Sequence, residues 1–477
     1  MSSVPPSIRA AYDPERFRAD GHRLIDALAD QLASWQAREG KTLPWQPPGQ
    51  ARAAWAAAGL DHGELVEDLM TITRASTALV HPHCMGHQVA PPLPSSALAE
   101  LVSALLNNGT GVCEMGPASV PIELAVIDWM CGVLGMPAGA GGTLTSGGSL
   151  GNLTALLAMR QVHAGFDVWK GGAHGGPPLA VIVSSDAHYS VARALRIMGW
   201  GDAGAVIADV DAGHRLTAAA VERALARAHG DGRRVIGIVA AAGSTATGAF
   251  DPLDELADLA AARNLWLHVD AAHGGGVALS PTHRHLLRGI ERADSVVWDA
   301  HKLLMMPALV TAVLYKRGSH AYSAFAQEAS YLFAATAPEE TWWDLGQRSL
   351  ECTKRMMSIE LWCALRSHGA ACFADIIDRQ IALTHELAAK LAATSDFEVA
   401  LPPTANILCY RHLAPEGVDL DAHNRDLRRR VVDDGRFYIV GTQLRSGYHL
   451  RSTLMNPLIE SRDLDDLIEH LRTLCRP

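Results

Sequence analysis

The sequence predicts an α/β protein with a mostly parallel central sheet and helices on both of its faces. Between residues 140 and 315, short apolar runs alternate with helical patterns. Near-continuous apolar strands of this kind are typical of a parallel sheet that is covered on both sides. The strands expected from this pattern are 179–185, 205–210, 235–241, 265–270, 295–300 and 310–315.

Two smaller parts flank this central region, which we place at residues 86–350. Residues 1–85 contain helical patterns at 17–37 and 65–79 on either side of a proline-rich stretch, LPWQPPGQ, and predict an N-terminal helical arm. Residues 351–477 open with a long helix at 352–369 and close with a helix at 461–474, which predicts a smaller C-terminal α+β domain. Three parts agree with 477 residues at about 150 residues per domain.

The composition excludes several classes of protein. Hydrophobic residues make up 48% and charged residues 19%, which excludes intrinsic disorder. A net charge of -10 argues against nucleic acid or an anionic membrane as the main partner, and so favours a small-molecule substrate.

The sequence also bears on location. Residues 129–159 carry no charge, but repeated glycines and Pro137 exclude a uniform apolar helix, so we interpret this run as buried loop and turn. The N-terminus lacks the apolar core of a signal peptide, and the eight cysteines form no CxxC pair. We therefore expect a reduced, cytoplasmic protein without a membrane span.

Ligands of α/β sheets bind outside the carboxyl ends of the strands, so the segments that follow the strands are candidate sites. The glycine-rich turn TSGGSLGN (145–152) precedes a helix for which Ser149 is a possible cap, and the amides of such a turn can bind phosphate. The alternative is a turn without a ligand. A further helix is expected at 251–263, with Asp251 as its N-cap and Pro252 at its first position.

Three side chains stand out in these segments. Asp270 ends a predicted strand and is either a structural cap or the partner of a buried cation. Lys302, one of six lysines, lies between an apolar strand and the run LLMMP, where a partly desolvated amine can form a Schiff base. His188 follows a third strand, where a single histidine is more often structural than catalytic.

Together, a phosphate cradle, an imidazole, a carboxylate and a desolvated lysine are the groups that hold pyridoxal 5'-phosphate. The lysine binds the aldehyde, and the carboxylate keeps the pyridine nitrogen protonated so that the ring accepts electrons. The imidazole supplies a flat surface for one face of the ring. No metal site is predicted.

Eight motifs, in order along nearly the whole chain, resemble the group II pyridoxal-phosphate-dependent amino-acid decarboxylases, which include the glutamate, cysteine-sulfinate, diaminobutyrate and aromatic amino-acid decarboxylases. The motifs are HPHCMGH (81–87), TSGGSLGN (145–152), DAHYS (186–190), AGSTATGAFDP (242–252), HVDAAHGG (268–275), DAHK (299–302), ASYLF (329–333) and LRSTLMNP (450–457). The resemblance implies a fold-type I transferase fold, a homodimer whose arm packs on the partner, and decarboxylation of an L-amino acid to CO2 and an amine.

The resemblance also implies residue roles. Lys302 would be the Schiff-base lysine, His188 the ring-stacking imidazole and Asp270 the partner of the pyridinium. The remaining cofactor-binding residues would be Gly148, Ser149, Thr245, Asp251, Ala272, Asp299 and His301, with Ala272 on the opposite ring face and Gly148, Ser149, Asp299 and His301 near the phosphate. Many relatives carry asparagine at the position of Asp299.

Four residues are expected to contact the substrate. Arg451 falls where the glutamate-decarboxylase branch has a carboxylate-binding arginine, although a solvated charge is the alternative. The position of His87 matches the substrate-entry segment of the family it resembles. A metal site with His81 and His83 is disfavoured because no carboxylate or thiolate pattern accompanies them. The other two are Trp343 and Tyr331.

Trp343 aligns with a loop tyrosine that relatives link to protonation of the substrate Cα, and an indole cannot perform the acid chemistry of a phenol. Tyr331 lies on a different motif. Another group, such as His188, would then protonate Cα, or the enzyme would divert to transamination or oxidative deamination. We rank decarboxylation first, above another fold-type I activity and above a protein that only binds the cofactor. Because the segment GTGVCEMGP (109–117) has no aromatic residue, acidic or diamino substrates are favoured over aromatic ones.

Overall fold

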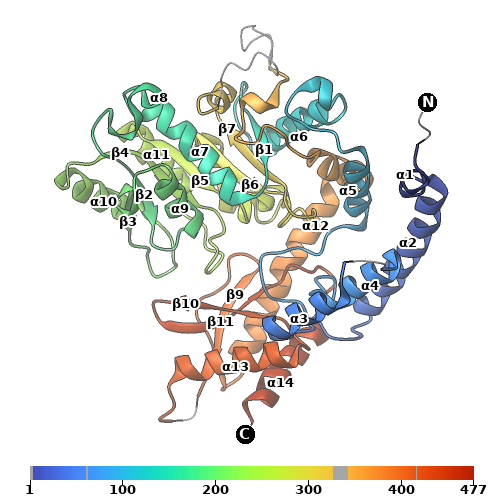
Figure 1. The fold of residues 1–477 in the computed structure, drawn as a ribbon. Coiled ribbons are helices and arrows are strands. Elements are labelled where there is room, and N and C mark those ends of the chain that lie inside the picture. Colours follow the sequence, from blue (N-terminus) through green and yellow to red (C-terminus); the bar gives the residue numbers. More distant parts are fainter. Residues whose placement is uncertain (1–3, 61–62, 326–341, 415, 477) are drawn as a thin grey trace. The chain divides into compact units, whose positions relative to one another are not determined.

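The computed structural model describes residues 4–60, 63–325, 342–414 and 416–476 (Figure 1). The chain divides into two compact units. The larger unit comprises Gln88–Ala389 and Val399–Cys409, and the smaller unit comprises Met1–His87, Lys390–Glu398 and Tyr410–Pro477. The three-part division at residues 85 and 350 stays a prediction.

The larger unit is built on a seven-stranded sheet in the order β1-β7-β6-β5-β4-β2-β3. Strand β7 runs antiparallel to both of its neighbours, and the other pairs are parallel, which confirms the mostly parallel sheet. The strands are β1 (Gly141–Thr145), β2 (Leu179–Ser184), β3 (Ala205–Ala208), β4 (Arg234–Ala241), β5 (Trp266–Asp270), β6 (Ser295–Asp299) and β7 (Thr311–Tyr315).

All six predicted strands are present, but the interpretation of residues 129–159 as loop and turn was wrong. This run holds the end of helix α6 (Ser119–Val133), strand β1 and most of helix α7 (Gly148–His163). Some of its glycines serve close packing: a Cβ on Gly142 would lie 2.1 Å from the carbonyl oxygen of Val313 on β7. Glycine in a strand often marks such a close approach of two backbones.

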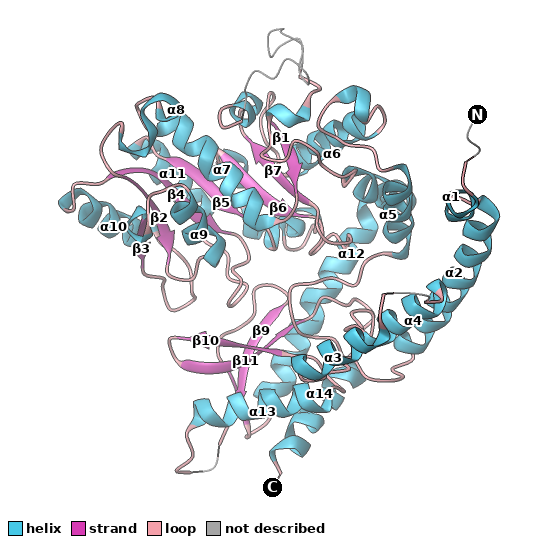
Figure 2. Ribbon diagram, in the orientation of Figure 1, coloured by secondary structure: helices cyan, strands magenta, loops and turns pink. Residues whose placement is uncertain are grey.

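Helices cover both faces of this sheet (Figure 2), and α7 packs against β1 and β4 to β7. Trp266 and Trp298, on adjacent strands, are fully buried in the core. The helices of this unit are α5 (Pro94–Leu106), α6 (Ser119–Val133), α7 (Gly148–His163), α8 (Val168–Gly171), α9 (Tyr189–Ile197), α10 (Ala218–Gly230), α11 (Leu253–Arg263) and α12 (Ser358–Ala392), which crosses into the smaller unit.

Two predicted helix caps were wrong. Helix α11 begins at Leu253 with Pro252 as its N-cap, and the Asp251 carboxylate instead accepts hydrogen bonds from the backbone N–H groups of Leu216 and Ala241, both at 2.7 Å. Ser149 lies inside α7, whose N-cap is Gly147. The helix expected at 352–369 begins later, at Ser358, and continues past Gly369, where the backbone departs from helical geometry.

The smaller unit joins the N-terminal helices to the C-terminal residues (Figure 1). The helices predicted at 17–37, 65–79 and 461–474 are present as α2, α4 and α14, whereas α3 starts inside the proline-rich stretch and was not expected. Its helices are α1 (Pro6–Ala11), α2 (Pro14–Gln36), α3 (Pro48–Ala58), α4 (Leu65–Ala75), α13 (Leu420–Asp434) and α14 (Ser461–Cys475).

A second sheet, in the order β10-β11-β9-β8, completes the C-terminal α+β region. Its strands are β8 (Phe397–Val399), β9 (Ile407–His412), β10 (Val440–Leu444) and β11 (Gly447–Thr453), and β9 continues from the larger unit into the smaller. Among the described residues, no helix is both long and apolar enough to cross a membrane.

Candidate active site

A cavity of about 290 Å³ lies in the larger unit, at the carboxyl ends of the strands. Asp270 and Asp299, the last residues of β5 and β6, both reach it. The cavity gathers every predicted cofactor-binding residue except Asp251: Gly148, Ser149, His188, Thr245, Asp270, Ala272, Asp299, His301 and Lys302. Asp251 is not among the lining residues, because its carboxylate is committed to the two backbone N–H groups described above.

Lys302 and Asp299 form an ion pair in this cavity. The Lys302 Nζ lies 2.9 Å from Asp299 Oδ2, and the Thr311 hydroxyl donates a 2.6 Å hydrogen bond to Asp299 Oδ1. His301 Nε2 is 3.5 Å from the same Oδ2. The buried carboxylate is thus surrounded by donors, which compensate the cost of removing its charge from water.

The first turn of α7 forms one wall of the cavity. Its N-cap, Gly147, has φ 99° and provides no capping side chain, so the first N–H groups of the helix are left for another acceptor. A Cβ at Gly148 would lie 3.0 Å from Asp299 Oδ2 and 3.5 Å from the Ala272 Cβ, so only glycine leaves this wall open. A phosphate group fits such a helix N-terminus.

Asn152 ties the Asp270 carboxylate to a buried polar network. Asp270 Oδ2 accepts a hydrogen bond from Asn152 Nδ2 at 2.9 Å, and Oδ1 accepts one from the backbone N–H of Ala272 at 3.2 Å. Asn152 Nδ2 also donates to the Ser190 hydroxyl at 2.9 Å, so both of its protons are used. The Asn152 Oδ1 must therefore accept from His268 Nε2, 3.0 Å away.

His268 is held as a neutral imidazole in this network. Complete burial lowers its pKa to about 4. With the proton on Nε2, the Nδ1 accepts a hydrogen bond from the Ser295 hydroxyl at 2.8 Å, and the Ser295 oxygen accepts one from the Trp266 indole, also at 2.8 Å. Each member of this chain has one consistent donor and acceptor assignment.

His188 is oriented by the same amide. The Asn152 amide donates to Ser190 Oγ, and that hydroxyl lies 2.7 Å from His188 Nδ1. Desolvation lowers the pKa of His188, the Lys302 charge lowers it further, and the Asp270 carboxylate partly opposes both. The ring is therefore neutral near pH 7. Its Nδ1 accepts a hydrogen bond from the backbone N–H of Ser190 at 3.4 Å, so the ring proton lies on Nε2. Because His188 lines the cavity, it brings the N–H group of a neutral imidazole to it.

Sequence reasoning missed Asn152, although the motif TSGGSLGN ends on it. Residues four apart share one face of a helix, so Asn152 lies one turn beyond Gly148, toward the same cavity. A side-chain amide on that face, opposite the predicted carboxylate, was the signal that could have identified it.

The predicted substrate residues are distributed differently. His87 and Arg451 both belong to the smaller unit, where partial desolvation and the charges of Arg451 and Arg428 lower the pKa of His87. Trp343 belongs to the larger unit, packs edge-on against Trp342 with ring centroids 5.5 Å apart, and is not among the residues that line the cavity. Tyr331 lies outside the described residues.

The family model for the pyridoxal-dependent decarboxylase conserved domain matches residues 50–413. The chain belongs to this family. It is 31% identical to an L-2,4-diaminobutyrate decarboxylase from Rhizobium meliloti (strain 1021), covering 96% of this chain and 92% of that protein. It is 28% identical to an acidic amino acid decarboxylase from Bos taurus, over 96% and 91% of the two chains. The crystal structure of mouse CSAD superposes with a TM-score of 0.89 at 27% identity, over 97% of this chain and all of that one.

These findings confirm the predicted family, fold and cofactor. The protein is a pyridoxal-phosphate-dependent amino-acid decarboxylase, and hence a carboxy-lyase. The cavity fits the cofactor on chemical grounds, because it combines an open helix N-terminus, an amine and an anchored carboxylate. The first suits a phosphate, the second an aldehyde and the third a pyridinium nitrogen.

Proposed function

We propose that this decarboxylase acts on an acidic or diamino L-amino acid and releases CO2 and the corresponding amine. The observation that carries the proposal is the meeting of Lys302, Asp270 and His188 in one cavity. Among the described residues that line it, none is phenylalanine, tyrosine or tryptophan, which favours a polar over an aromatic substrate. The names of the Rhizobium and Bos relatives support the same two substrate classes.

The proposed roles follow from the contacts. Bound pyridoxal phosphate supplies the electron sink for the carbanion that remains after CO2 departs. Lys302 would hold the aldehyde end of the cofactor, and its amine would have to leave the ion pair with Asp299 to do so. Asp270, fixed by Asn152, accepts the hydrogen bond of the pyridine nitrogen.

His188 is proposed to stack on the ring and to deliver the proton to the substrate Cα from its Nε2. The tautomer set by Ser190 supports this role, because Nδ1 accepts hydrogen bonds there and the ring proton therefore lies on Nε2. Nδ1 would take up a proton as Nε2 gives up its own, so that the ring ends neutral. Oxidative deamination or transamination is the second candidate activity. The reason is that Trp343 stands at the position aligned with a tyrosine in relatives, and an indole cannot perform the acid chemistry of a phenol.

Substrate recognition is proposed for His87, Arg451, Trp343 and Tyr331. Arg451 would bind a substrate carboxylate as a guanidinium fork. Electrostatics supports this role, because the positive charges of Arg451 and Arg428 both lower the pKa of His87. These three side chains would make a region of the smaller unit that attracts anionic groups.

We further propose a cytoplasmic homodimer in which the arm, residues 1–85, packs on the partner. Helix α5 exposes a stripe of large apolar side chains at helical spacing, and α2 buries none of its 23 residues. Apolar stripes of this kind favour association. The stripe on α5 consists of Leu98, Leu101, Val102, Leu105 and Leu106. The eight free cysteines suit a reducing compartment.

The dimer is tested by sedimentation of the holoenzyme. A Leu101→Asp, Leu105→Asp variant should sediment as a monomer and lose activity. The control is Ile197→Asp, which places one such charge at a single exposed apolar residue of α9 and should remain a dimer. An active wild-type monomer at assay concentration would refute the proposal.

The substrate class is tested by incubating the holoenzyme with acidic, diamino and aromatic L-amino acids while CO2, amine and ammonia are measured together. We expect equal amounts of CO2 and amine from an acidic or diamino substrate and no ammonia. Ammonia with an aldehyde would instead establish oxidative deamination. Turnover of aromatic substrates alone would overturn the proposed class.

A further inference from the structure

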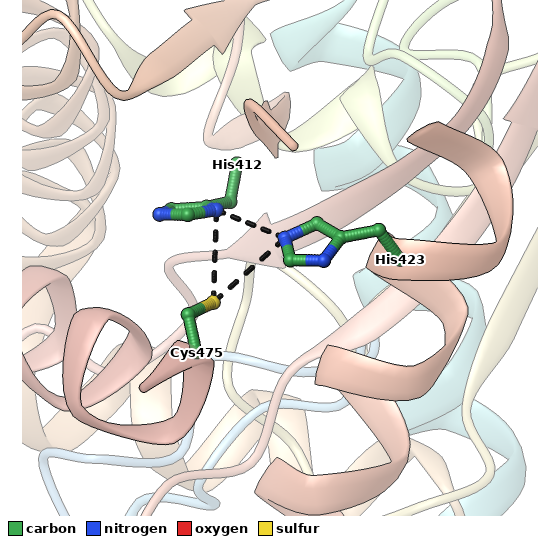
Figure 3. Close-up of side chains that lie close together, drawn as sticks. All are labelled: His412, His423 and Cys475. Carbon is green, nitrogen blue, oxygen red and sulfur yellow. Dashed lines mark hydrogen bonds between the residues drawn. The ribbon is translucent and has the colours of Figure 1, made fainter. Parts of the chain in front are cut away.

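A second group of reactive side chains lies in the smaller unit, outside the site described above. His412 ends strand β9, His423 lies in α13, and Cys475 ends α14 (Figure 3). His412 Nδ1 is 3.0 Å from His423 Nε2, and the Cys475 Sγ is 3.6 Å from the first nitrogen and 3.9 Å from the second. The three side chains point toward one another from three separate elements (Figure 3).

This triangle has the dimensions of a zinc coordination sphere. Zinc binds imidazole nitrogen at about 2.0–2.1 Å and thiolate sulfur at about 2.3 Å, usually as a tetrahedron. Such a tetrahedron separates two nitrogens by about 3.3 Å and a nitrogen from a sulfur by about 3.5 Å. We propose that His412, His423 and Cys475 bind one Zn²⁺ ion, with water as its fourth ligand.

The backbone around the three ligands is already fixed by other contacts. Asn424, buried beside His423, accepts a hydrogen bond from the backbone N–H of His412 and donates one to its carbonyl oxygen, both at 2.9 Å. Arg430, also on α13, donates to the carbonyl oxygen of Leu474 at 3.0 Å. Helix α13 therefore holds the chain at both of the other ligands, and little ordering remains to be done when the ion binds.

The protonation states of the histidines also suit a metal. An imidazole has an ordinary pKa of about 6.5, so the rings of His412 and His423 can each offer a lone pair near pH 7. The Asp396 carboxylate lies 4.0 Å from His412 Nε2, on the far side of that ring from the cluster. A carboxylate behind a ligating imidazole is a recurrent feature of zinc sites.

Binding replaces one proton by the ion. Zinc binds the thiolate, so the proton of the Cys475 thiol leaves to solvent as Zn²⁺ takes its place. No electron is transferred. The ion links β9, α13 and α14, which gives it a stabilising role that is separate from decarboxylation. Without the ion, the same groups would form a hydrogen-bonded cluster, and an experiment must separate these two cases.

The test uses metal-depleted holoenzyme that retains its pyridoxal phosphate. We expect it to bind one equivalent of Zn²⁺, with a rise in its thermal midpoint, and to bind Co²⁺ with a thiolate-to-metal charge-transfer absorption. Cys475→Ser and His423→Gln should each lose the tight site and the absorption. The matched control is Cys352→Ser, since Cys352 is an exposed free thiol of the larger unit, and it should behave as wild type.

An alkylation assay on the wild-type protein avoids any effect of the variants on folding. Zn²⁺ should slow alkylation of Cys475 by iodoacetamide at least tenfold and leave Cys352 equally reactive, as mapped by mass spectrometry. Unchanged alkylation of Cys475, no zinc bound by the wild type, or equal binding by Cys475→Ser would each overturn the proposal in favour of the hydrogen-bonded cluster alone.

Discussion

Asn152 Nδ2 lies 2.9 Å from Asp270 Oδ2 and connects helix α7 to the carboxyl end of β5. The same helix begins at Gly148, whose missing side chain opens the phosphate wall of the cavity. One helix therefore sets two features of the cofactor site at once, the anion-binding turn and, one turn later, the amide that holds the carboxylate. Any shift of α7 would move both together.

Replacement of Asn152 should impair the cofactor site without unfolding the protein. Asn152→Leu removes the donors to Asp270 and Ser190, and hydrogen bonds to charged groups contribute about 1.5–3 kcal/mol. We expect kcat to fall about 10- to 100-fold, since each 1.36 kcal/mol is a factor of ten in rate. The holoenzyme absorption spectrum should change as well, because both Asp270 and His188 lose their orientation.

The control for this variant is Asn108→Leu, which changes a half-buried asparagine outside the cavity. Steady-state kinetics and the cofactor spectrum of both variants give the comparison. If Asn152→Leu retained wild-type kcat and spectrum, the network would be structural only.

Borohydride reduction of the holoenzyme should attach the pyridoxyl group to Lys302 and to no other lysine. The reason is geometric, because Lys302 is the lysine that reaches the cavity among the described residues. Lys302→Ala should lose both the label and turnover, whereas Lys170→Ala, at an exposed lysine of α8, should keep both. Peptide mapping by mass spectrometry decides, and label on a different lysine would refute the assignment.

The positions of Lys302, Asp270 and His188 could be predicted because each follows an apolar strand, and strand ends in a parallel sheet meet at one edge. The sequence could not show that Asp251 lies outside the cavity. The backbone N–H groups that bind its carboxylate belong to Leu216 and Ala241, which are distant in sequence. Strand β1 was missed for a related reason, because glycine-rich sequence is typical of turns. Only the contact between β1 and β7 shows why a glycine is needed at Gly142 within a strand.

The His412, His423 and Cys475 cluster shows the same limit. Its members are separated by 11 and 52 residues, and no short motif joins them. Metal ligands at long separations become visible only when the fold brings β9, α13 and α14 together. The histidine-rich motif HPHCMGH attracts attention in the sequence, yet His83 stacks on Phe437 with ring centroids 4.0 Å apart and serves packing.

The stability of the protein should fall as the pH drops from about 6.5 to about 4, in part because of His268. Its folded-state pKa is lowered to about 4 by burial, whereas an exposed histidine titrates near about 6.5. Between these values the unfolded chain takes up a proton that the folded protein does not. The His268 contribution is therefore present above pH 6.5 and is lost as the pH falls, on the order of 1–3 kcal/mol.

His268→Gln keeps a donor for the Asn152 oxygen but cannot titrate, so its thermal midpoint should depend less steeply on pH over this range. His229→Gln removes an exposed histidine and should follow the wild-type curve. Some slope should remain in His268→Gln, because burial also lowers the pKa of His81 to about 4. Identical slopes in His268→Gln and wild type would show that His268 does not contribute.

A buried ion pair fixes strand β1, which leads into the phosphate turn. The Lys354 Nζ lies 2.5 Å from Glu123 Oε1 and also donates to the Thr143 hydroxyl and the Leu144 carbonyl oxygen, both at 3.0 Å. Both charged side chains are almost fully buried. Removal of one partner leaves the other charge buried without compensation, which costs about 3–5 kcal/mol.

Lys354→Met should therefore lower the denaturant midpoint strongly and weaken cofactor retention, because the Gly-rich turn follows β1 directly. The double change Glu123→Leu, Lys354→Met removes both charges and should recover much of the loss, since an apolar pair of similar volume is often as stable as a buried ion pair. Lys170→Met, at an exposed lysine, is the control and should change the midpoint little. Equal losses in the single and double variants would show that the strand needs the hydrogen bonds of Lys354 and Glu123 themselves, and not only charge balance.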